Sequence, residues 1–343
     1  MKGFGVPAGW LAGSAVVLFV AGVFGISAGA ASLSAADILR HLLSLLPLGT
    51  ESPLTERQEA LLMELRLPRV VMGAVVGALL ATAGGAYQGV FRNPLADPFL
   101  LGAASGAGLG ATIVMVFGQD LTADPRALVP VAAFIGALMG VATAYALGSA
   151  AGGGGTAALV LAGVAVSSFL SAAQTLVQQM GVDQLQRIYA WLLGGLGRGG
   201  WDDVQLIAPY AIVGLVVLLL SGYLLDMLAL GDDKAVSLGL NPAVVRMVVI
   251  AAASLATAAA VSVSGLIGFV GIVVPHIVRR LVGSNYRAIL PVTVLAGGAF
   301  LVTVDIVART IVAPAELPIG VVTAFLGAPF FVLILRTTRH RGT

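Results

Sequence analysis

The chain has 343 residues, of which 59% are hydrophobic and only 10% are charged, and its mean hydropathy is +1.03. Soluble domains carry about 25% charged residues, so this composition excludes a soluble globular protein. The formal net charge of +2 says little by itself, and no nucleic-acid partner is expected. The absence of cysteine excludes a disulfide framework, a thiolate metal site and a cysteine nucleophile.

Apolar runs recur along the whole chain, and each is long enough to cross about 30 Å of hydrocarbon as a helix. They lack the alternation of apolar and polar residues that β-barrel strands show. The sequence therefore predicts an all-α polytopic membrane protein, with a single transmembrane domain over residues 1–343 and about ten transmembrane helices. The first run is expected to be an uncleaved helix rather than a signal peptide. The expected spans are 9–30, 70–91, 99–118, 127–147, 157–179, 204–224, 244–264, 266–283, 288–308 and 317–336.

Three connections are longer than a turn. Residues 31–68 contain "SAADILRHLLSLL", which predicts an external interfacial helix followed by a polar link. Residues 180–203 predict an external short helix and a Gly-rich turn, with Trp191 and Trp201 at headgroup depth. The third connection, 228–241, reads "LALGDDKAVSLGLN" and inserts charge between two apolar spans.

Glycines recur four residues apart in several expected spans. This spacing is typical of lipid-embedded helices whose backbones pack closely. The sequence therefore predicts a tight bundle. The rows are Gly73/Gly77, Gly85/Gly89, Gly102/Gly106/Gly110 and Gly136/Gly140.

Basic residues set the expected orientation. An even number of spans puts both termini on one side, and the end "LRTTRHRGT" is strongly basic. Because cytoplasmic segments are enriched in Lys and Arg, the protein is expected in the cell membrane with both termini on the cytoplasmic side. The segment 228–241 then lies in the cytoplasm too.

Several kinds of chemistry lack the residues they need. The two lysines, Lys2 and Lys234, do not follow the Gly-x-x-x-x-Gly pattern of a phosphate-binding loop. The three histidines, His41, His276 and His340, are spread over distant segments without metal-ligand spacing. We therefore expect no catalytic residue, no resident metal and no cofactor in this chain.

Buried carboxylates are the usual mark of carriers driven by an ion gradient. Asp305 is the best candidate, but it lies one helical turn before Arg309. An ion pair between these two residues explains Asp305 more simply. The chain therefore lacks an obvious energy source of its own.

Gln174 and Gln178 share one face of the fifth expected span, near its outer end. Amides facing lipid are costly, so these side chains are expected to face a translocation path or a subunit interface. Hydrogen bonding between neighbouring helices explains them equally well.

Four segments closely resemble a known family. Together they resemble the permease subunits of type II ABC importers, which take up haem, ferric siderophores and cobalamin and whose best-known member is the membrane subunit of the cobalamin importer. The segments are "LRLPRVVMGAVVGALLATAGGAYQGVFRNPLADPFLLGAASGAGLGA" (65–111), "ALGDDKAVSLGL" (229–240), "VSGLIGFVGIVVPHIVRRLVG" (263–283) and "DIVARTIVAPAELPIGVVTAFLGAPFF" (305–331).

The resemblance implies a homodimer with the substrate path at the subunit interface. It implies two ATP-binding-cassette ATPase subunits on the cytoplasmic side, which bind ATP and Mg²⁺, and an extracytoplasmic substrate-binding protein on the other side. Helices two to five and seven to ten would form an inverted repeat. The implied cargo is a bulky metal chelate moved by alternating access, with haem or a ferric siderophore favoured and a corrinoid such as cobalamin next.

The charged connection can be interpreted from its own residues. Gly231 ends the preceding helix, Asp232 and Asp233 suit the start of a short one, and Gly239 stops it. Ala235, Val236 and Leu238 are expected to form an apolar contact face. The resemblance implies that this short cytoplasmic helix fits a groove on the ATPase and acts as a lever. The implied coupling residues are Leu230, Gly231, Asp232, Asp233, Lys234, Ala235, Val236, Ser237, Leu238 and Gly239.

Three arginines fall on the external side, Arg66 and Arg69 before the second span and Arg309 after the ninth. The resemblance implies that they meet glutamates of the binding protein, where bidentate pairs would fix the docking geometry. The alternative is that they anchor at lipid headgroups or pair with acids of the same chain, which are Glu64, Asp305 and Glu316.

The alternative function is a stand-alone, ion-coupled secondary transporter, and an integral membrane enzyme is a more distant one. The motifs quoted above are shared by haem, siderophore and corrinoid permeases. They do not distinguish between these cargoes.

Overall fold

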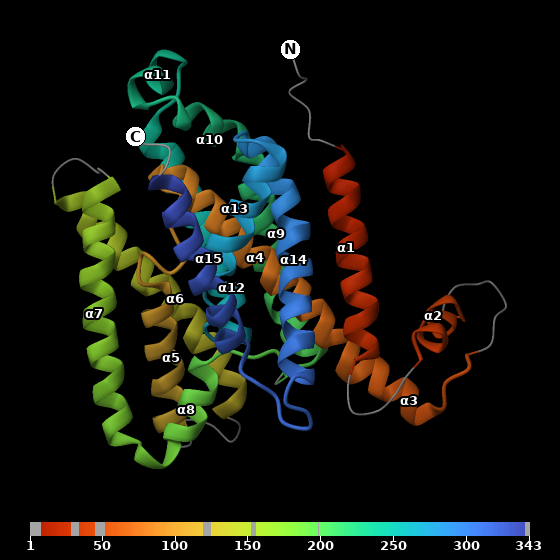
Figure 1. The fold of residues 1–343 in the computed structure, drawn as a ribbon. Coiled ribbons are helices and arrows are strands. Elements are labelled where there is room, and N and C mark those ends of the chain that lie inside the picture. The colour runs from red at the N-terminus through yellow and green to blue at the C-terminus, as the bar shows by residue number, and fades with distance from the viewer. Residues whose placement is uncertain are drawn as a thin grey trace.

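Apolar helices run side by side through the whole molecule (Figure 1). The computed structural model describes residues 8–28, 34–44, 52–118, 125–151, 156–197 and 199–339, and no strand occurs in these ranges. The long helices are α1 (Ala8–Ser27), α4 (Leu67–Phe91), α5 (Ala103–Phe117), α6 (Pro125–Ala150), α7 (Thr156–Met180), α9 (Trp201–Leu220), α12 (Pro242–Ser264), α13 (Val270–Val282), α14 (Tyr286–Thr310) and α15 (Ile319–Arg339). The short elements are α2 (Ala35–Ser44), α3 (Glu56–Ala60), the π-helix η1 (Leu61–Arg66), the 3₁₀-helix η3 (Val182–Gln184), α8 (Leu185–Leu192), α10 (Gly222–Ala229) and α11 (Asp232–Ser237).

Each expected span coincides with one of the long helices, which confirms the all-α membrane fold. Seven helices of the described chain are long and apolar enough to cross a membrane. The other three are shorter. Helix α5 and the apolar part of α15 fall below that length. Helix α13 has 13 residues and carries Pro275, Arg279 and Arg280.

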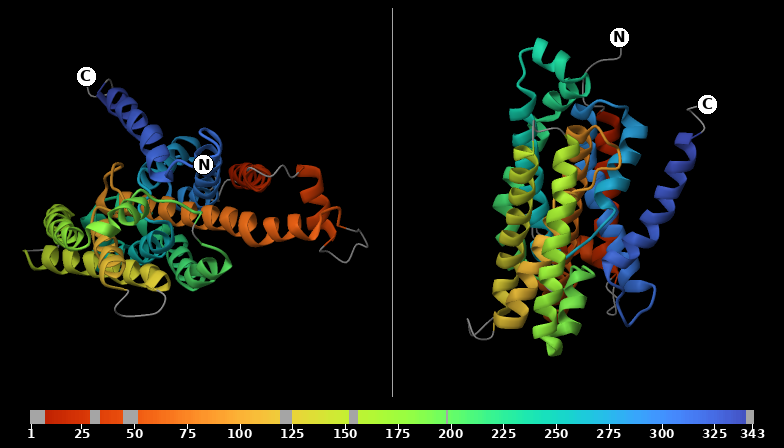
Figure 2. Two further views of the ribbon diagram at one scale, coloured as in Figure 1. Left: turned by 90° about the horizontal axis from the view of Figure 1, so that it is seen from below. Right: turned by 90° about the vertical axis from the view of Figure 1, so that its left-hand side faces the viewer.

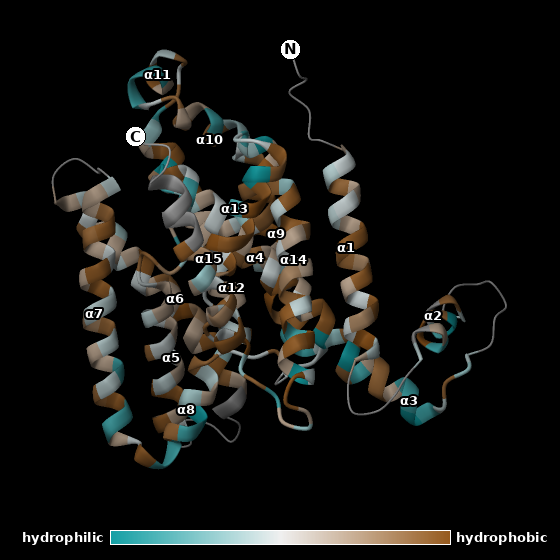
Figure 3. Cartoon of the chain, in the orientation of Figure 1, coloured by the Kyte–Doolittle hydropathy of each residue, from teal (hydrophilic) through white to brown (hydrophobic). Residues whose placement is uncertain are grey.

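The polar elements lie at the two ends of the bundle. Helices α10 and α11 and the start of α1 lie at one end, and α3 and α8 lie at the other (Figure 1). We call these the α11 end and the α8 end. Hydrophilic residues gather at both ends, while the middle of the bundle is apolar (Figure 3). This distribution fits a bilayer around the middle, with water at each end.

The packing follows the inverted repeat that the resemblance implies. The first half consists of α4, α5, α6 and α7, and the second half consists of α12, α13, α14 and α15. Helix α4 packs on α13 and α14 of the second half, and its counterpart α12 packs on α5 and α6 of the first half. Likewise, α5 packs on α6 and α7, and its counterpart α13 packs on α14 and α15. Helices α4 and α12 also pack on each other, and α9 packs on both. Helix α15 leans away from the rest of the bundle in both views of Figure 2.

Glycines let the helix backbones touch, as the four-residue spacing predicts. A Cβ atom added to Gly106 of α5 would overlap the carbonyl oxygen of Gly136 in α6. In the same way, a Cβ atom on Gly77 of α4 would overlap the carbonyl oxygen of Gly297 in α14. Only residues without a side chain permit such approaches in lipid-embedded helices.

The external connection before α4 is more helical than expected. Residues from Glu56 onward form α3 and η1, which continue directly into α4. A capping box starts this stretch: Gln58 N–H donates to Thr55 Oγ1, and Thr55 N–H donates to Gln58 Oε1. The expected polar link is therefore confined to residues before Thr55.

The connection 180–203 contains the expected short helix α8. Trp191 is 4% exposed and packs in the hydrophobic core rather than toward lipid, and its depth at the headgroups stays a prediction. The turn after α8 is held by the bundle: the carbonyls of Leu193 and Gly194 accept the N–H groups of Gly320 and Ile319. This turn therefore caps the start of α15 and draws Trp191 inward.

Candidate functional site

Helix α11 forms where the sequence predicts it. Gly231 precedes it with φ +109°, and Gly239 follows it with φ +85°, a region that favours glycine. The N–H of Gly239 donates to Val236 O at 2.9 Å, and the N–H of Leu240 donates to Ala235 O at 3.0 Å. This pair of bonds is a Schellman motif, which satisfies the carbonyls at the end of a helix. The predicted stop at Gly239 is confirmed.

The apolar face of α11 differs from the predicted one in one residue. Ala235 is completely buried against the bundle, so it is not part of an exposed contact face. Leu230, Val236 and Leu238 are 55%, 58% and 56% exposed. These three side chains form the apolar surface that the α11 end offers to a partner. Beside them, Asp233, Lys234 and Ser237 are also exposed.

Asp232 is the one acid of α11 that turns toward the bundle. Its carboxylate accepts hydrogen bonds from Arg246 Nη2 at 2.6 and 2.7 Å and pairs with Arg92. The hydrogen bonds from Arg246, followed by those from Arg92, hold the pKa of Asp232 below its ordinary value. Arg92 ends α4, and Arg246 lies in the first turns of α12. Sequence reasoning singled out neither arginine.

Helix α10 is attached by a second acid that sequence reasoning did not assign. Asp226 accepts the N–H of Tyr286 at 2.6 Å and the Nε–H of Arg287 at 3.2 Å. Because free N–H groups at a helix start need acceptors, Asp226 acts as a cap for α14. Arg279 of α13 joins this cluster and donates to Tyr286 Oη at 3.1 Å and to Gln88 Oε1 at 3.2 Å.

At the α8 end, Arg69 bridges two acids of its own chain. Its Nε and Nη2 atoms donate to Asp305 Oδ1 at 3.0 and 2.8 Å. Its Nη1 and Nη2 atoms donate to Glu316 Oε1 and Oε2 at 3.0 and 2.9 Å. Such two-pronged pairs are among the stronger hydrogen bonds in proteins. The side chain of Arg69 is 15% exposed, and that of Glu316 is 50% exposed.

Arg66 and Arg309 both point at the end of α1. Arg66 is buried, and its Nη1 donates to Ile26 O at 2.9 Å and Ser27 O at 3.1 Å. Arg309 donates to Gly25 O at 2.8 Å and Ala28 O at 3.0 Å. These arginines satisfy carbonyls that the last turn of a helix leaves unpaired.

The predicted ion pair between Arg309 and Asp305 is confirmed at 3.0 Å. Arg69 pairs with Asp305 and Glu316, two of the three acids that the alternative interpretation named. Arg66, Arg69 and Arg309 are thus all turned inward in the single chain. Their role in docking stays a prediction.

Glu316 gives this end of the bundle a pH dependence that can be measured. The hydrogen bonds from Arg69 hold the pKa of Glu316 below its ordinary value. The contact therefore contributes its full stability above the ordinary glutamate pKa of about 4.3 and loses it as the pH falls through the lowered pKa. We expect the melting temperature of Glu316→Gln to lie below that of wild type by a constant amount from about pH 8 to pH 5, and the gap to close below about pH 4.

The control for this experiment is Glu64→Gln, which changes an exposed glutamate at the same end. It is expected to melt with wild type at every pH. A gap between wild type and Glu316→Gln that closes between neutral pH and pH 5 would contradict the depressed pKa.

The two glutamines of the expected path do not share one environment. Gln174 is buried, and its amide lies against Gly108 of α5, where an added Cβ atom would lie 2.7 Å from Oε1. Gln178, one turn further along α7, is half-buried. Contact with α5 is what the helix–helix interpretation expects of Gln174. A path role for Gln174 and Gln178 stays a prediction.

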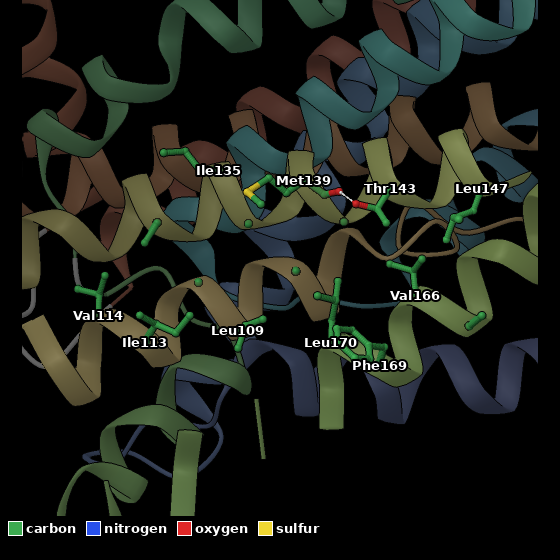
Figure 4. A pocket seen from close by; sticks show the side chains of 16 residues that line it. Leu109, Ile113, Val114, Ile135, Met139, Thr143, Leu147, Val166, Phe169 and Leu170 are labelled. Carbon is green, nitrogen blue, oxygen red and sulfur yellow. Dashed lines mark hydrogen bonds between the residues drawn. The ribbon is translucent and has the colours of Figure 1, made fainter. Parts of the chain in front are cut away.

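An apolar pocket of about 610 Å³ lies between α5, α6 and α7 (Figure 4). Gly106 and Gly110 of α5 and Gly136 and Gly140 of α6 line the pocket, and so do the side chains of Phe169 and Met139. Thr143 lines it but already donates its hydroxyl to Met139 O at 2.8 Å. Thr143 is the one polar side chain in a lining that is otherwise glycine and apolar.

No group of three or more metal-ligating side chains comes together in the part of the chain that the structure describes. The charged and exposed features described above lie at the two ends of the bundle. The α11 end offers the exposed side chains of Leu230, Val236 and Leu238, on and beside a short helix. The α8 end offers a network of arginines and carboxylates.

Comparison with known proteins places the chain in a family. Residues 17–337 match the FecCD transport family. The chain is 42% identical over 287 residues to the cobalamin import system permease protein BtuC of Halobacterium salinarum. The aligned region covers 84% of this chain and 76% of that protein. It is 40% identical over 289 residues to the hemin transport system permease protein HmuU of Yersinia pestis, which covers 82% of this chain and 84% of that protein.

A solved structure extends the likeness to the fold. It is assigned to the metal-chelate type of ABC transporters and has an inward-facing conformation. The TM-score is 0.83 at 30% identity, and the match covers 95% of this chain and 98% of that chain. The chain therefore belongs to the FecCD transport family and is a membrane-spanning permease subunit of an ABC importer.

Proposed function

We propose that the chain forms a homodimer that carries a bulky metal chelate across the cell membrane by alternating access. The family implies an ATPase partner and a substrate-binding protein. The energy comes from ATP and Mg²⁺ bound by two separate ATPase subunits, since this chain holds no phosphate-binding loop. The resemblance and the uncovered side of α15 support the homodimer (Figure 2).

The observation that carries this proposal is the exposed apolar surface of α11. Val236 projects from the short helix α11, and Leu230 and Leu238 lie just before and just after that helix, at one end of the bundle (Figure 1). Exposed apolar side chains grouped on one element mark protein contacts. This surface suits a groove on the ATPase, so the segment 228–241 is the coupling segment and the α11 end faces the cytoplasm. Both termini lie on that side.

The α8 end is proposed to receive the substrate-binding protein. Arg66, Arg69 and Arg309 lie there, but their guanidinium groups are engaged within the chain. Of their partners, Glu316 is the one with a half-exposed side chain. A carboxylate of the binding protein would therefore reach Arg69 by taking the place of Glu316.

The proposed cargo is haem or a ferric siderophore, with a corrinoid such as cobalamin next. The relatives support this class, since their names refer to hemin and to cobalamin. The binding protein does most of the selecting. The absorption spectrum of the binding protein purified with its ligand distinguishes haem, ferric chelate and corrinoid.

Reconstitution in liposomes tests the function. The purified chain alone is expected to move no substrate under an ion gradient. Movement is expected once the ATPase, ATP, Mg²⁺ and the loaded binding protein are present. Movement by the chain alone would contradict the proposal and support a secondary transporter.

Substitution of the coupling segment tests the role of α11. Replacing Asp232, Asp233 and Lys234 together with alanine is expected to lower transport about tenfold or more while ATP hydrolysis continues, because the segment loses the ion pairs of Asp232 with Arg92 and Arg246 and a hydrogen bond to a charged group contributes about 1.5 kcal/mol or more. Insertion of residues at Gly231 is expected to act in the same way. The measurement is the number of ATP molecules hydrolysed per substrate transported. Normal coupling in both variants would contradict the assignment of this segment.

A further inference from the structure

The side chain of Asp232 faces the bundle, whereas its neighbours Asp233 and Lys234 face water. Two guanidinium groups hold it. Arg246 donates to both carboxylate oxygens, at 2.6 and 2.7 Å, and Arg92 pairs with the same carboxylate. The carboxylate is thus bound from the bundle side, while the side chain of Asp232 stays 45% exposed.

The two arginines belong to different halves of the inverted repeat. Arg92 follows the last residue of α4, and Arg246 lies near the start of α12. Helices α4 and α12 are the first helices of their halves, and they pack on each other in the middle of the bundle. One carboxylate on α11 thus joins the α11 ends of both helices.

The backbone of Arg92 indicates that its side chain is needed there. Arg92 has φ +48°, a left-handed conformation for which glycine is the usual residue at the end of a helix. The side chain makes two contacts that glycine cannot make. Its Nε–H donates to Leu228 O at 2.9 Å, and its Nη2 binds Asp232. Arg92 therefore holds both α10 and α11 against the end of α4.

We propose that Asp232 is a positioning residue that fastens α11 to α4 and α12, so that displacement of α11 moves both helices together. This inference rests on the coupling role of segment 228–241 proposed above. It divides the segment into two parts. Leu230, Val236 and Leu238 contact the partner, and Asp232 transmits the motion inward.

Hydrogen exchange in the purified full-length permease tests the attachment without any ATPase. In Asp232→Ala, amide exchange across residues 230–240 is expected to be about tenfold faster, because the charge-assisted hydrogen bonds that hold the segment are removed. Exchange in the middle of α12 is expected to stay as in wild type. The control is Asp183→Ala, an exposed acid at the α8 end, which is expected to leave residues 230–240 unchanged. Equal exchange in Asp232→Ala and wild type would overturn the proposal.

The reconstituted importer tests the transmission. Asp232→Ala alone is expected to raise the ATP hydrolysed per substrate about tenfold and to leave the affinity for the ATPase near the wild-type value, because the carboxylate is engaged by Arg92 and Arg246 of its own chain. The double variant Asp233→Ala/Lys234→Ala is expected to weaken ATPase binding instead. Loss of ATPase binding in Asp232→Ala with normal coupling in the bound fraction would overturn the proposal.

A covalent link can replace the ion pair, because the chain has no native cysteine. The pair Asp232→Cys/Arg246→Cys is expected to be uncoupled like Asp232→Ala and to recover coupling when a short bis-maleimide joins the two thiols. Modification of either single cysteine variant is expected to restore nothing. Failure of the cross-linked pair to recover would show that the attachment to α12 does not transmit the motion. Failure of the wild-type importer to couple ATP to transport would instead count against the proposed function, while the hydrogen-exchange result would still stand.

Discussion

Gly84→Ala is expected to destabilise the bundle by about 3 kcal/mol, the upper range for overpacking in a tightly packed core. Gly84 lies in α4 where this helix touches α13. A Cβ atom added there would overlap the carbonyl oxygen of Gly271 and lie 2.5 Å from its Cα atom. These are backbone atoms, so no rotation of a side chain can relieve the overlap. The two helices would have to separate.

The measurement is the melting temperature of the purified permease. Melting is detected as the loss of permease from the monodisperse peak in size-exclusion chromatography. The matched control is Gly13→Ala in the middle of α1, where an added Cβ atom meets nothing within 4 Å. Alanine is the better helix former by about 0.5–1 kcal/mol, so this variant is expected to melt at or slightly above the wild-type temperature. Equal melting of Gly84→Ala and Gly13→Ala would contradict the close approach of α4 and α13.

The helices themselves could be predicted because the signals that set them are local. A run of apolar residues determines a span, and capping residues determine its ends. Asn241 and Pro242 begin α12, with Asn241 Oδ1 accepting the N–H groups of Ala243 and Val244. Gly239 ends α11 for an equally local reason, since glycine takes positive φ at low cost.

The contacts of the charged residues could not be predicted, because their partners are distant in sequence. Asp232 and Arg92 are 140 positions apart, and their pairing depends on the packing of α10 against α4. Asp226 and its partners near the start of α14 are separated in the same way. The charges of these residues are visible in the sequence, but the fold decides which of them meet.

The direction of the external arginines also depends on structure that is not visible in the sequence. Arg66 ends the π-helix η1, in which each turn takes in one more residue than in an α-helix. One residue corresponds to about 100° around a helix, so the face of Arg66 cannot be extrapolated from α4. The result is that Arg66 turns to the carbonyls of Ile26 and Ser27. The unpaired carbonyls at the end of α1 are a local signal that could have suggested this role.

Asp305→Asn is expected to destabilise the permease by about 3 kcal/mol, as removal of one partner of a buried ion pair does. The side chain of Asp305 is 2% exposed and pairs with Arg69 and Arg309 at 2.8 and 3.0 Å. Asparagine has nearly the same shape but carries no charge, so two guanidinium groups near the membrane surface lose their shared counter-ion. Arg69 keeps Glu316, whereas Arg309 keeps backbone carbonyls alone, those of Gly25, Ala28 and residue 305.

The same variant separates the ABC importer from an ion-coupled carrier. If Asp305 serves as the counter-ion of two arginines, transport per folded molecule in the reconstituted importer stays near the wild-type value and only the melting temperature falls. If Asp305 carried protons, transport would be abolished and the fold retained. The control is Asp202→Asn, which neutralises an exposed carboxylate at the same end. It is expected to change the free energy of unfolding by less than about 0.5 kcal/mol and so to leave the melting temperature near that of wild type. A stable, inactive Asp305→Asn protein would contradict the structural role, because the loss of a buried counter-ion must appear first in stability.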